Sequence, residues 1–259
     1  RDDDLADYGL QDVTLGGVTI SSTDLIRRRW LDNDFYGVTY DLNYENSNIQ
    51  ATLGGAYNEY DGLHFGEVIW AQYASNGSIR ERYYESRSDK SDFNTYAKVN
   101  YQVTDGLNLF GDLQLRRITY SGFGVDNDQR VIDFDTDFTF VNPKFGATYN
   151  LTESSSIYGS FAVGNKEPNR SDIIDATPGT EPKHETLNNI EIGYRKRTGR
   201  TVFEANYYLM DYKNQLVLTG EVNDVGGSIR TNVPDSYRMG VELVGGMQLN
   251  SWFGFQANL

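Results

Sequence analysis

The chain has 259 residues, a formal net charge of −14 and no cysteine, and only 38% of its residues are hydrophobic. The negative charge argues against nucleic acid as a partner, because binding to phosphates requires a basic surface. The absence of cysteine excludes a disulfide framework and a thiolate metal site. Tyrosine (19 residues) and glycine (26) are abundant, which is typical of strands that are apolar on one face and polar on the other.

The dominant pattern along the chain is an alternation of apolar and polar residues with a period of two, which predicts β-strands. No segment predicts a convincing helix, and none approaches the ~20 consecutive apolar residues of a membrane-spanning helix. Most of the alternating segments are long enough to cross a membrane when tilted, since about 9–11 residues suffice. In chain order, the segments predicted as strands are 36–44, 49–57, 93–102, 107–116, 141–149, 157–163, 190–194, 203–210, 239–248 and 252–259.

The connections between these segments are of two kinds, which alternate strictly along the chain. Short connections carry turn residues and lie at 45–48, 104–106, 150–154, 198–200 and 250–251. Long polar connections are predicted at 61–90, 122–136, 164–185 and 215–232. Outer-membrane barrels have short periplasmic turns and long outer loops. The pattern therefore predicts an all-β protein, an antiparallel transmembrane β-barrel, and the alternative is a large soluble antiparallel β protein.

A sheet inside a membrane must close on itself, because an unpaired backbone group in hydrocarbon costs several kcal/mol. Small residues such as Gly54, Gly146 and Gly240 stand at positions predicted to face inward, which indicates a lumen wider than about ten strands would enclose. We therefore expect residues 1–259 to form part of one barrel domain, with the signal peptide and the first and last strands outside this chain.

Two segments, 156–172 and 181–195, resemble the C-terminal signature of TonB-dependent receptors. In that family an aromatic residue and a proline end one strand, and an Asn-x-Glu-x-Gly element opens the next. Residues 212–217 and 232–243 also resemble that family, and 24–37 resembles receptors of Bacteroidetes type. Two positions depart from the pattern, since His184 stands where the family usually has proline and Asn232 is followed by Val-Pro. The positions that match the signature are Phe161, Pro168, Lys183, Glu185, Asn189, Glu191 and Gly193.

The resemblance implies a barrel of about 22 strands around a plug domain, in the outer membrane of a Gram-negative bacterium, and we expect that plug domain to lie outside this chain. Such a receptor captures a scarce small-molecule nutrient and releases it when TonB, bound to a segment absent from this chain, delivers energy. Its other partners would be outer-membrane lipid and, for some cargoes, a surface lipoprotein. The favoured cargo is an iron chelate (siderophore or haem) or cobalamin. The alternatives are a glycan-importing receptor and a passive porin or adhesive barrel, and enzyme motifs are not found.

Segment 61–90 concentrates aromatic and arginine side chains, which suit stacking on a ligand and binding of an anionic chelate. The candidate ligand contacts are Phe65, Trp70, Tyr73, Arg80, Arg82, Tyr83, Tyr84 and Arg87. Ordinary packing of the segment is the alternative. The two histidines, His64 and His184, are predicted to lie in separate outer loops, where they could bind haem iron or simply be solvated.

An acidic run follows at 125–137, in which Asp126, Asp128, Asp133 and Asp135 offer carboxylate oxygens. Calcium binds six to eight oxygens, so the run predicts a possible calcium site in an outer loop. The alternative is a solvated acidic rim, and no other cofactor is expected. Charged residues predicted to face the lumen, including Arg116, Arg195 and Glu204, are expected to form ion pairs along the wall.

Overall fold

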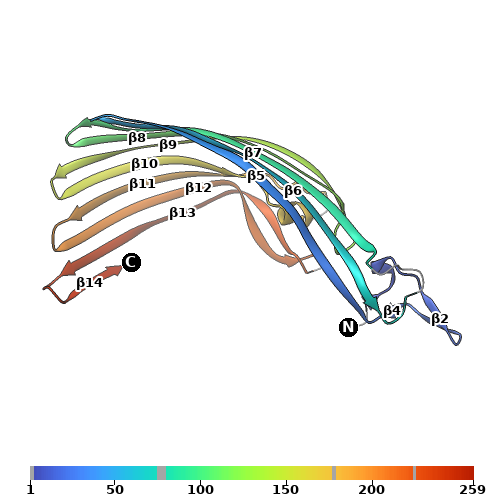
Figure 1. The fold of residues 1–259 in the computed structure, drawn as a ribbon. Helices are drawn as coiled ribbons and strands as arrows, with labels where there is room; N and C mark the ends of the chain where they lie inside the picture. Colours follow the sequence, from blue (N-terminus) through green and yellow to red (C-terminus); the bar gives the residue numbers. More distant parts are fainter. Residues whose placement is uncertain (1–2, 75–79, 177–178, 224–225) are drawn as a thin grey trace. The chain divides into compact units, whose positions relative to one another are not determined.

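The computed structural model describes residues 3–74, 80–176, 179–223 and 226–259. Ten antiparallel strands form one sheet in which every strand pairs with its neighbours in the chain, from β5 at one edge to β14 at the other (Figure 1). This architecture confirms the predicted all-β antiparallel fold. The strands are β5 (Leu25–Glu45), β6 (Ile49–Ala71), β7 (Arg82–Thr104), β8 (Leu107–Val125), β9 (Val131–Thr152), β10 (Ser155–Lys166), β11 (Glu185–Arg197), β12 (Thr201–Val222), β13 (Ser228–Gln248) and β14 (Gly254–Asn258).

Several strands are far longer than the alternating pattern predicted. The predicted long loops 61–90, 122–136 and 215–232 are wrong over most of their described length, because β6, β7, β8, β9, β12 and β13 continue into them. The regular alternation of apolar and polar residues is lost there, since glycine and charged residues stand among apolar ones on both faces, but the backbone goes on pairing. Between β10 and β11, by contrast, the long connection remains and spans 167–184.

The predicted short turns are confirmed, and side chains cap their backbone groups. Asn46 Oδ1 accepts hydrogen bonds from the backbone N–H groups of Asn48 (2.9 Å) and Ile49 (2.8 Å). The Thr104 hydroxyl oxygen accepts from Gly106 (3.3 Å) and Leu107 (3.1 Å) in the next turn. These residues satisfy donors that a tight turn would otherwise leave unpaired.

The two faces of the sheet differ in polarity, as the register of β9 to β13 shows. Directly paired residues of antiparallel strands lie on the same face. Phe161 pairs with Phe145 and with Ile190, whereas Glu191 pairs with Ser160 and with Tyr208. We call the first the apolar face and the second the polar face. The apolar face is largely exposed, with Phe145 56% and Ile192 59% exposed, as expected for a surface that meets lipid.

The chain forms two compact units. The first comprises residues 1–38, 57–93 and 117–138, and the second comprises 39–56, 94–116 and 139–259. The first unit includes a small N-terminal arrangement of β1 (Asp3–Asp4), the 3-10 helix η1 (Ala6–Tyr8), β2 (Val13–Leu15), β3 (Val18–Ile20) and β4 (Ser22–Thr23). Its side chains form a hydrophobic core with β7, made of Leu5, Tyr8, Leu10, Tyr83 and Tyr84.

The second unit contains the short helix α1 (Arg170–Ile174) within the 167–184 connection. A capping box starts this helix, since the Asn169 side chain accepts from the Asp172 backbone and the Asp172 carboxylate accepts from the Asn169 backbone. Asp172 is 2% exposed at its side chain and pairs with Arg230 Nη1 at 3.1 Å. In the described part of the chain, neither helix is long and apolar enough to cross a membrane.

Candidate functional site

Part of the predicted ligand segment forms a layered aromatic and arginine stack in the first unit. The rings of Trp30 and Phe65 stack with centroids 5.9 Å apart and planes 16° apart. The Arg82 guanidinium lies 3.8 Å from the centroid of the Phe65 ring, a distance at which the ring attracts a cation. Trp30 lies on β5, 37 residues before its hydrogen-bond partner Glu67. It is therefore outside the predicted ligand segment and is not among the ligand contacts predicted from the sequence.

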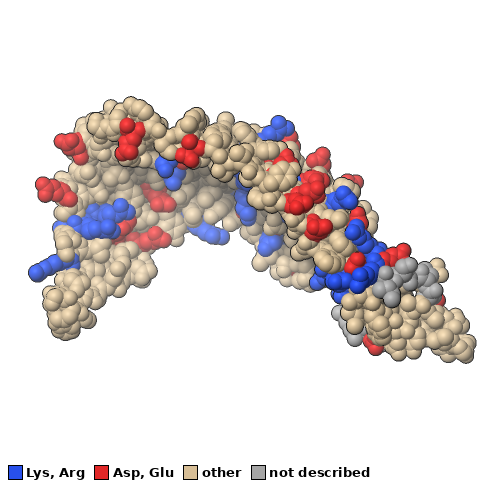
Figure 2. Space-filling view, in the orientation of Figure 1, with Lys and Arg blue, Asp and Glu red and all other residues tan. Residues whose placement is uncertain are grey.

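Glu67 holds the outer layer of this stack in place. Trp30 Nε1 donates to Glu67 Oε2 at 3.1 Å, and Arg28 Nη2 lies 3.7 Å from the same oxygen. The Arg28 guanidinium also lies 5.0 Å from the Trp30 ring. The stack is therefore a set of mutually paired side chains, with Trp30 41% exposed, at an end of the sheet where Figure 2 shows acidic and basic side chains intermingled.

Two of the candidate residues, Tyr83 and Tyr84, are buried in the N-terminal core instead. They are 9% and 7% exposed, and the Tyr83 ring lies 4.8 Å from that of Tyr8 and 5.0 Å from that of Tyr84. The Tyr83 hydroxyl donates to Asn127 Oδ1 at 3.0 Å. Burial raises the pKa of Tyr83 above its ordinary value, against the opposing effect of nearby Arg27. These rings are covered, so ligand contact would require the N-terminal segment to move.

The other members of the predicted set do not form one group. Trp70 is 50% exposed near the end of β6, and Arg87 pairs with Glu85 at 3.6 Å. Arg80 adopts a left-handed backbone conformation with φ 71°. Tyr73 is placed by its backbone N–H, which donates to Thr23 Oγ1 at 2.9 Å.

His64 does not lie in a loop, so that prediction is wrong: it lies within β6. Side chains of adjacent strand residues point to opposite faces, so His64 lies on the face opposite Phe65. There the Tyr60 hydroxyl lies 3.4 Å from His64 Nε2 and donates to Asn33 Oδ1 at 3.0 Å. We call Asn33, Tyr60 and His64 the polar row.

Gly62 makes this arrangement possible. A Cβ at Gly62 would lie 2.3 Å from the Tyr60 hydroxyl oxygen, so the Tyr60 ring lies along its own strand over the glycine and reaches His64. Sequence reasoning missed the polar row because it assigned His64 to a loop and left Asn33 and Tyr60 outside the predicted strands. The signal that could have found it is the two-residue spacing of Tyr60, Gly62 and His64.

His184 precedes β11, within the connection that remains a loop, as predicted. Its ring lies 5.4 Å from the ring of Phe140, tilted by 59°. The neighbouring backbone is held by Asn232, whose side chain accepts from the Lys183 N–H at 2.8 Å and donates to the Lys183 carbonyl at 3.0 Å. The same side chain donates to the carbonyl of Asn214 at 2.6 Å, so a residue of the matched family segment joins the loop to β12.

The aspartates of the acidic run do not come together as a metal site. Asp126 is 7% exposed and accepts from the Asp128 and Arg130 backbone N–H groups and from the Arg130 guanidinium. Asp133 and Asp135 lie on β9, exposed, alternating along the strand as Asp137 does. Within the described ranges, no group of three or more His, Cys, Asp or Glu could hold a metal ion, so the predicted calcium site gains no support.

Asp137 is paired with an arginine instead. Its carboxylate accepts from Arg117 Nη2 at 2.7 Å and from Arg117 Nε at 3.3 Å. This hydrogen bonding lowers the pKa of the Asp137 carboxyl and raises that of the Arg117 guanidinium. The acidic run is thus partly neutralised by arginines, as a charged surface would be.

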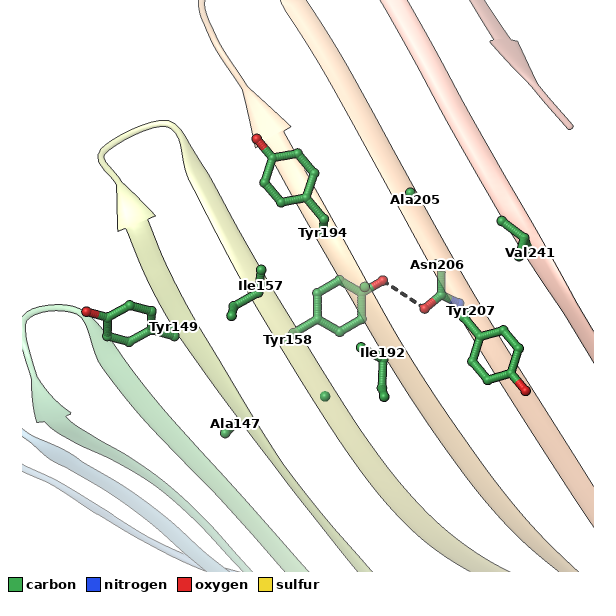
Figure 3. A pocket seen from close by; sticks show the side chains of 12 residues that line it. Ala147, Tyr149, Ile157, Tyr158, Ile192, Tyr194, Ala205, Asn206, Tyr207 and Val241 are labelled. Carbon is green, nitrogen blue, oxygen red and sulfur yellow. Dashed lines mark hydrogen bonds between the residues drawn. The ribbon is translucent and has the colours of Figure 1, made fainter.

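The Asn-x-Glu-x-Gly element lies on the polar face of the second unit. Asn189 Nδ2 donates to Glu191 Oε1 at 2.8 Å. A Cβ at Gly193 would lie 2.2 Å from Cζ of Tyr158, so the glycine makes room for that ring. The single proton of the Tyr158 hydroxyl is shared between two acceptors, Asn206 Oδ1 at 3.1 Å and Glu204 Oε1 at 3.3 Å, and the first of these contacts is drawn in Figure 3.

Ion pairs line the polar face as predicted. Arg195 Nη2 lies 2.8 Å from Glu204 Oε1, and its guanidinium lies 5.3 Å from the Tyr158 ring. Arg116 pairs with Glu167, with Nη1 3.2 Å from Oε2.

The other signature residues pack against neighbouring side chains, are buried or form ion pairs. Phe161 packs on Phe145 with ring centroids 5.2 Å apart on the apolar face. Pro168 is buried just after β10, and Glu185 pairs with Lys166 at 3.3 Å.

Comparison with known proteins agrees with this architecture. The family model described as "TonB dependent receptor-like, beta-barrel" matches residues 2–259, whereas no curated protein matches the chain. Among solved structures, the copper transporter OprC is 14% identical with a TM-score of 0.75, over 90% of this chain and 37% of that one.

Two iron-related receptors are also similar. The ferric-catecholate import receptor Fiu from E. coli K12 is 16% identical with a TM-score of 0.59, over 92% of this chain and 38% of that one. The ferric yersiniabactin uptake receptor FyuA from Yersinia pestis is 15% identical with a TM-score of 0.61, over 92% and 37%. The chain thus spans less than two fifths of each structure, and such identities show the fold alone. The family match shows more: the chain belongs to the TonB-dependent receptors, a family of β-barrels in the outer membrane of Gram-negative bacteria and not of enzymes.

Proposed function

We propose that the protein imports a metal chelate across the outer membrane and that TonB supplies the energy for release. The observation that carries this proposal is the family match over residues 2–259. The favoured cargo is an iron chelate, a siderophore or haem, with cobalamin as the other metal-containing candidate. The similar structures include a ferric-catecholate import receptor, a ferric yersiniabactin uptake receptor and a copper transporter, which supports a metal-containing cargo.

The polar row, which contains the predicted ligand residue His64, is well placed to meet a cargo inside a barrel. Phe65 and Tyr57 are eight residues apart on β6, so their side chains point to the same face of the sheet. Tyr57 is 41% exposed, and this face therefore continues the side that meets lipid and solvent. Tyr60 and His64 lie on the opposite face, which in a barrel is the lumen side. Imidazole and phenol groups offer the nitrogen and oxygen donors that transition metals and polar chelates bind. Energy is needed because a tight site releases its cargo only when its state changes.

Growth of a strain lacking the protein tests the cargo. The strain is grown with iron supplied as a siderophore complex or as haem, with limiting cobalamin, with limiting copper, or on glycans as the carbon source. We expect a deficit on one metal-containing source, restored by the wild-type gene only when TonB is present. A deficit on a glycan instead would support the glycan-importing alternative. Uptake that persists without TonB would identify a passive porin, and no deficit on any source would refute import.

Substitutions test the polar row within the same strain. His64→Ala and Tyr60→Phe are expected to weaken uptake of the cargo while the protein level in the outer membrane stays unchanged. Leu63→Ala is the matched control, because Leu63 is adjacent to His64 but lies on the opposite face. Equal uptake by all three variants would show that the polar row does not contact the cargo.

A further inference from the structure

A groove crosses the apolar face of the second unit from β9 to β13. It has a volume of 620 Å³, and its walls include Tyr149, Ile157, Ile192, Tyr194 and Tyr207 (Figure 3). A second hollow of 530 Å³ adjoins it, because both are lined by Ala147, Gly159 and Ile192. The two together form a continuous apolar depression in the surface that meets lipid.

Small residues make the floor of this groove. Ala147 and Gly159 are directly paired across β9 and β10, and Ala205 lies two strands further along. On either side of the Ala147–Gly159 pair stand larger pairs, Phe145 with Phe161 and Tyr149 with Ile157. Because neither Ala147 nor Gly159 has side-chain atoms beyond Cβ, a channel is left between the two larger pairs.

The channel is open, unlike the spaces above glycines of the polar face. A Cβ at Gly159 would meet no atom closer than the Glu191 carbonyl oxygen at 3.8 Å. Cβ atoms at Gly193 and Gly240, by contrast, would lie 2.2 Å and 2.7 Å from tyrosine atoms. Atoms that line an unfilled hollow lose the dispersion contacts that a filling group would give them. No ring of the described chain fills this one. In a membrane the molecule available to fill it is hydrocarbon.

Polar groups stand at one end of the groove, toward the short turns. Figure 3 shows the hydroxyl group of Tyr194 directed toward the hairpin turn of its own strand. The Tyr149 ring lies beside the neighbouring short turn, since a Cβ at Gly106 would lie 3.6 Å from Tyr149 Cε2. Lys196 follows Tyr194 on the same face, paired with Phe203, and its side chain is exposed. Two residues of strand advance by about 6.6 Å, so the Lys196 backbone lies that far beyond the Tyr194 backbone, in the direction of the turn, where an interfacial zone is expected.

We propose that this groove binds an acyl chain of a glycerophospholipid from the leaflet on the short-turn side, with the lipid phosphate at Lys196. The apolar lining selects a hydrocarbon chain, and the cation with two hydroxyls selects an anionic head at one end only. The chemistry matches an anionic phospholipid such as phosphatidylglycerol. The proposal depends on the outer-membrane location and is independent of the cargo.

Native mass spectrometry of the intact protein, purified from outer membranes in mild detergent and titrated with phosphatidylglycerol, tests the proposal. Ala147→Leu and Ala205→Leu fill the floor with apolar atoms that a lipid-facing site tolerates. Each displaces about two methylene groups of the bound chain, and we expect about a tenfold loss of affinity. Ala97→Leu is the matched control. Ala97 is an exposed residue of β7 outside the groove, and it lies on the same face as the apolar Phe93 and Val99, at even spacings from both.

The lipid head is tested separately by Lys196→Gln. We expect this variant to lose its preference for phosphatidylglycerol over phosphatidylethanolamine, without a change in the fold of the barrel. Lipid retention that is the same in all four variants and the wild type would show only non-specific lipid around the barrel and overturn the proposal. Retention of lipopolysaccharide in place of phospholipid would also overturn it. If either Ala147→Leu or Ala205→Leu fails to fold, the other variant and Lys196→Gln still test whether the groove binds phospholipid.

Discussion

Replacing Gly193 by alanine should destabilise the barrel through Tyr158. The new Cβ would lie 2.2 Å from Cζ and 2.4 Å from the hydroxyl oxygen of that ring, so the ring must leave its position. Overpacking of this kind costs about 1–3 kcal/mol, and the displaced hydroxyl loses a bond to the Glu204 carboxylate, about 1.5 kcal/mol. Relief of glycine's chain entropy returns about 0.5–1 kcal/mol. The three terms sum to a net loss of about 1.5–4 kcal/mol, and because the ring tip can swing aside we expect a value near the lower end of that range.

A double-mutant cycle in urea isolates this contact. The intact protein, folded into lipid vesicles, is unfolded and scored by the mobility of the folded barrel on unheated gels. In a Tyr158→Ala background the collision is gone, so Gly193→Ala should become neutral or stabilising. Gly199→Ala is the control, because a Cβ there meets nothing within 4 Å. An equal effect of Gly193→Ala in both backgrounds would refute the reasoning.

Three further predictions concern the loops and the N-terminal segment. Asp172→Asn removes the charge that pairs with Arg230 at 3.1 Å; since such a bond contributes about 1.5–3 kcal/mol, proteolysis within 167–184 should speed up by about tenfold or more, and an unchanged rate would contradict the pairing. Asn232→Ala should raise hydrogen exchange at Lys183, whose N–H it accepts, while Asn232→Asp, which keeps the acceptor but loses both donors, should have an intermediate effect; no change for either would show that the loop is held elsewhere. Burial raises the pKa of Tyr83 from its ordinary 10.0, so its contribution to folding is complete below pH 10.0 and is lost as the pH rises through the higher folded pKa; alkaline release of the N-terminal segment, followed by limited proteolysis, should therefore be reduced in Tyr83→Phe, and identical release in both proteins would rule out this titration.

The order and the faces of the strands could be predicted from the sequence, because the period-two pattern depends only on which side of the sheet meets lipid. Phe161, Ile190 and Met239 are apolar residues of three segments predicted as strands, and the register of β9 to β13 places them on one face. The short turns were predicted for the same kind of local reason. Asn46 and Thr104 cap their own turns, and such bonds require no knowledge of distant residues.

Strand length could not be predicted in the same way. Beyond the apolar band the alternation has no lipid side to reveal it, so the parts of β6 and β7 within 61–90 were predicted as a loop although they are strands. Ser86 and Ser88 illustrate this, since they are 2% and 3% exposed and polar in a segment that looked solvated. Inward-facing glycines were misread for a related reason. Gly54 and Gly240 looked like unfilled lumen, yet tyrosine rings of neighbouring strands occupy the space beside them.

The candidate site shows why a cluster in sequence need not be a cluster in space. In a strand, neighbouring residues point to opposite faces, so His64 and Phe65 can never contact the same ligand on one side of the wall. Grouping by composition joined them, whereas the contacts actually made join residues of different strands, Trp30 with Phe65 and Tyr60 with Asn33. Residues that contact the cargo therefore have to be sought among cross-strand neighbours on the lumen face, and that requires the register, which a single sequence does not contain.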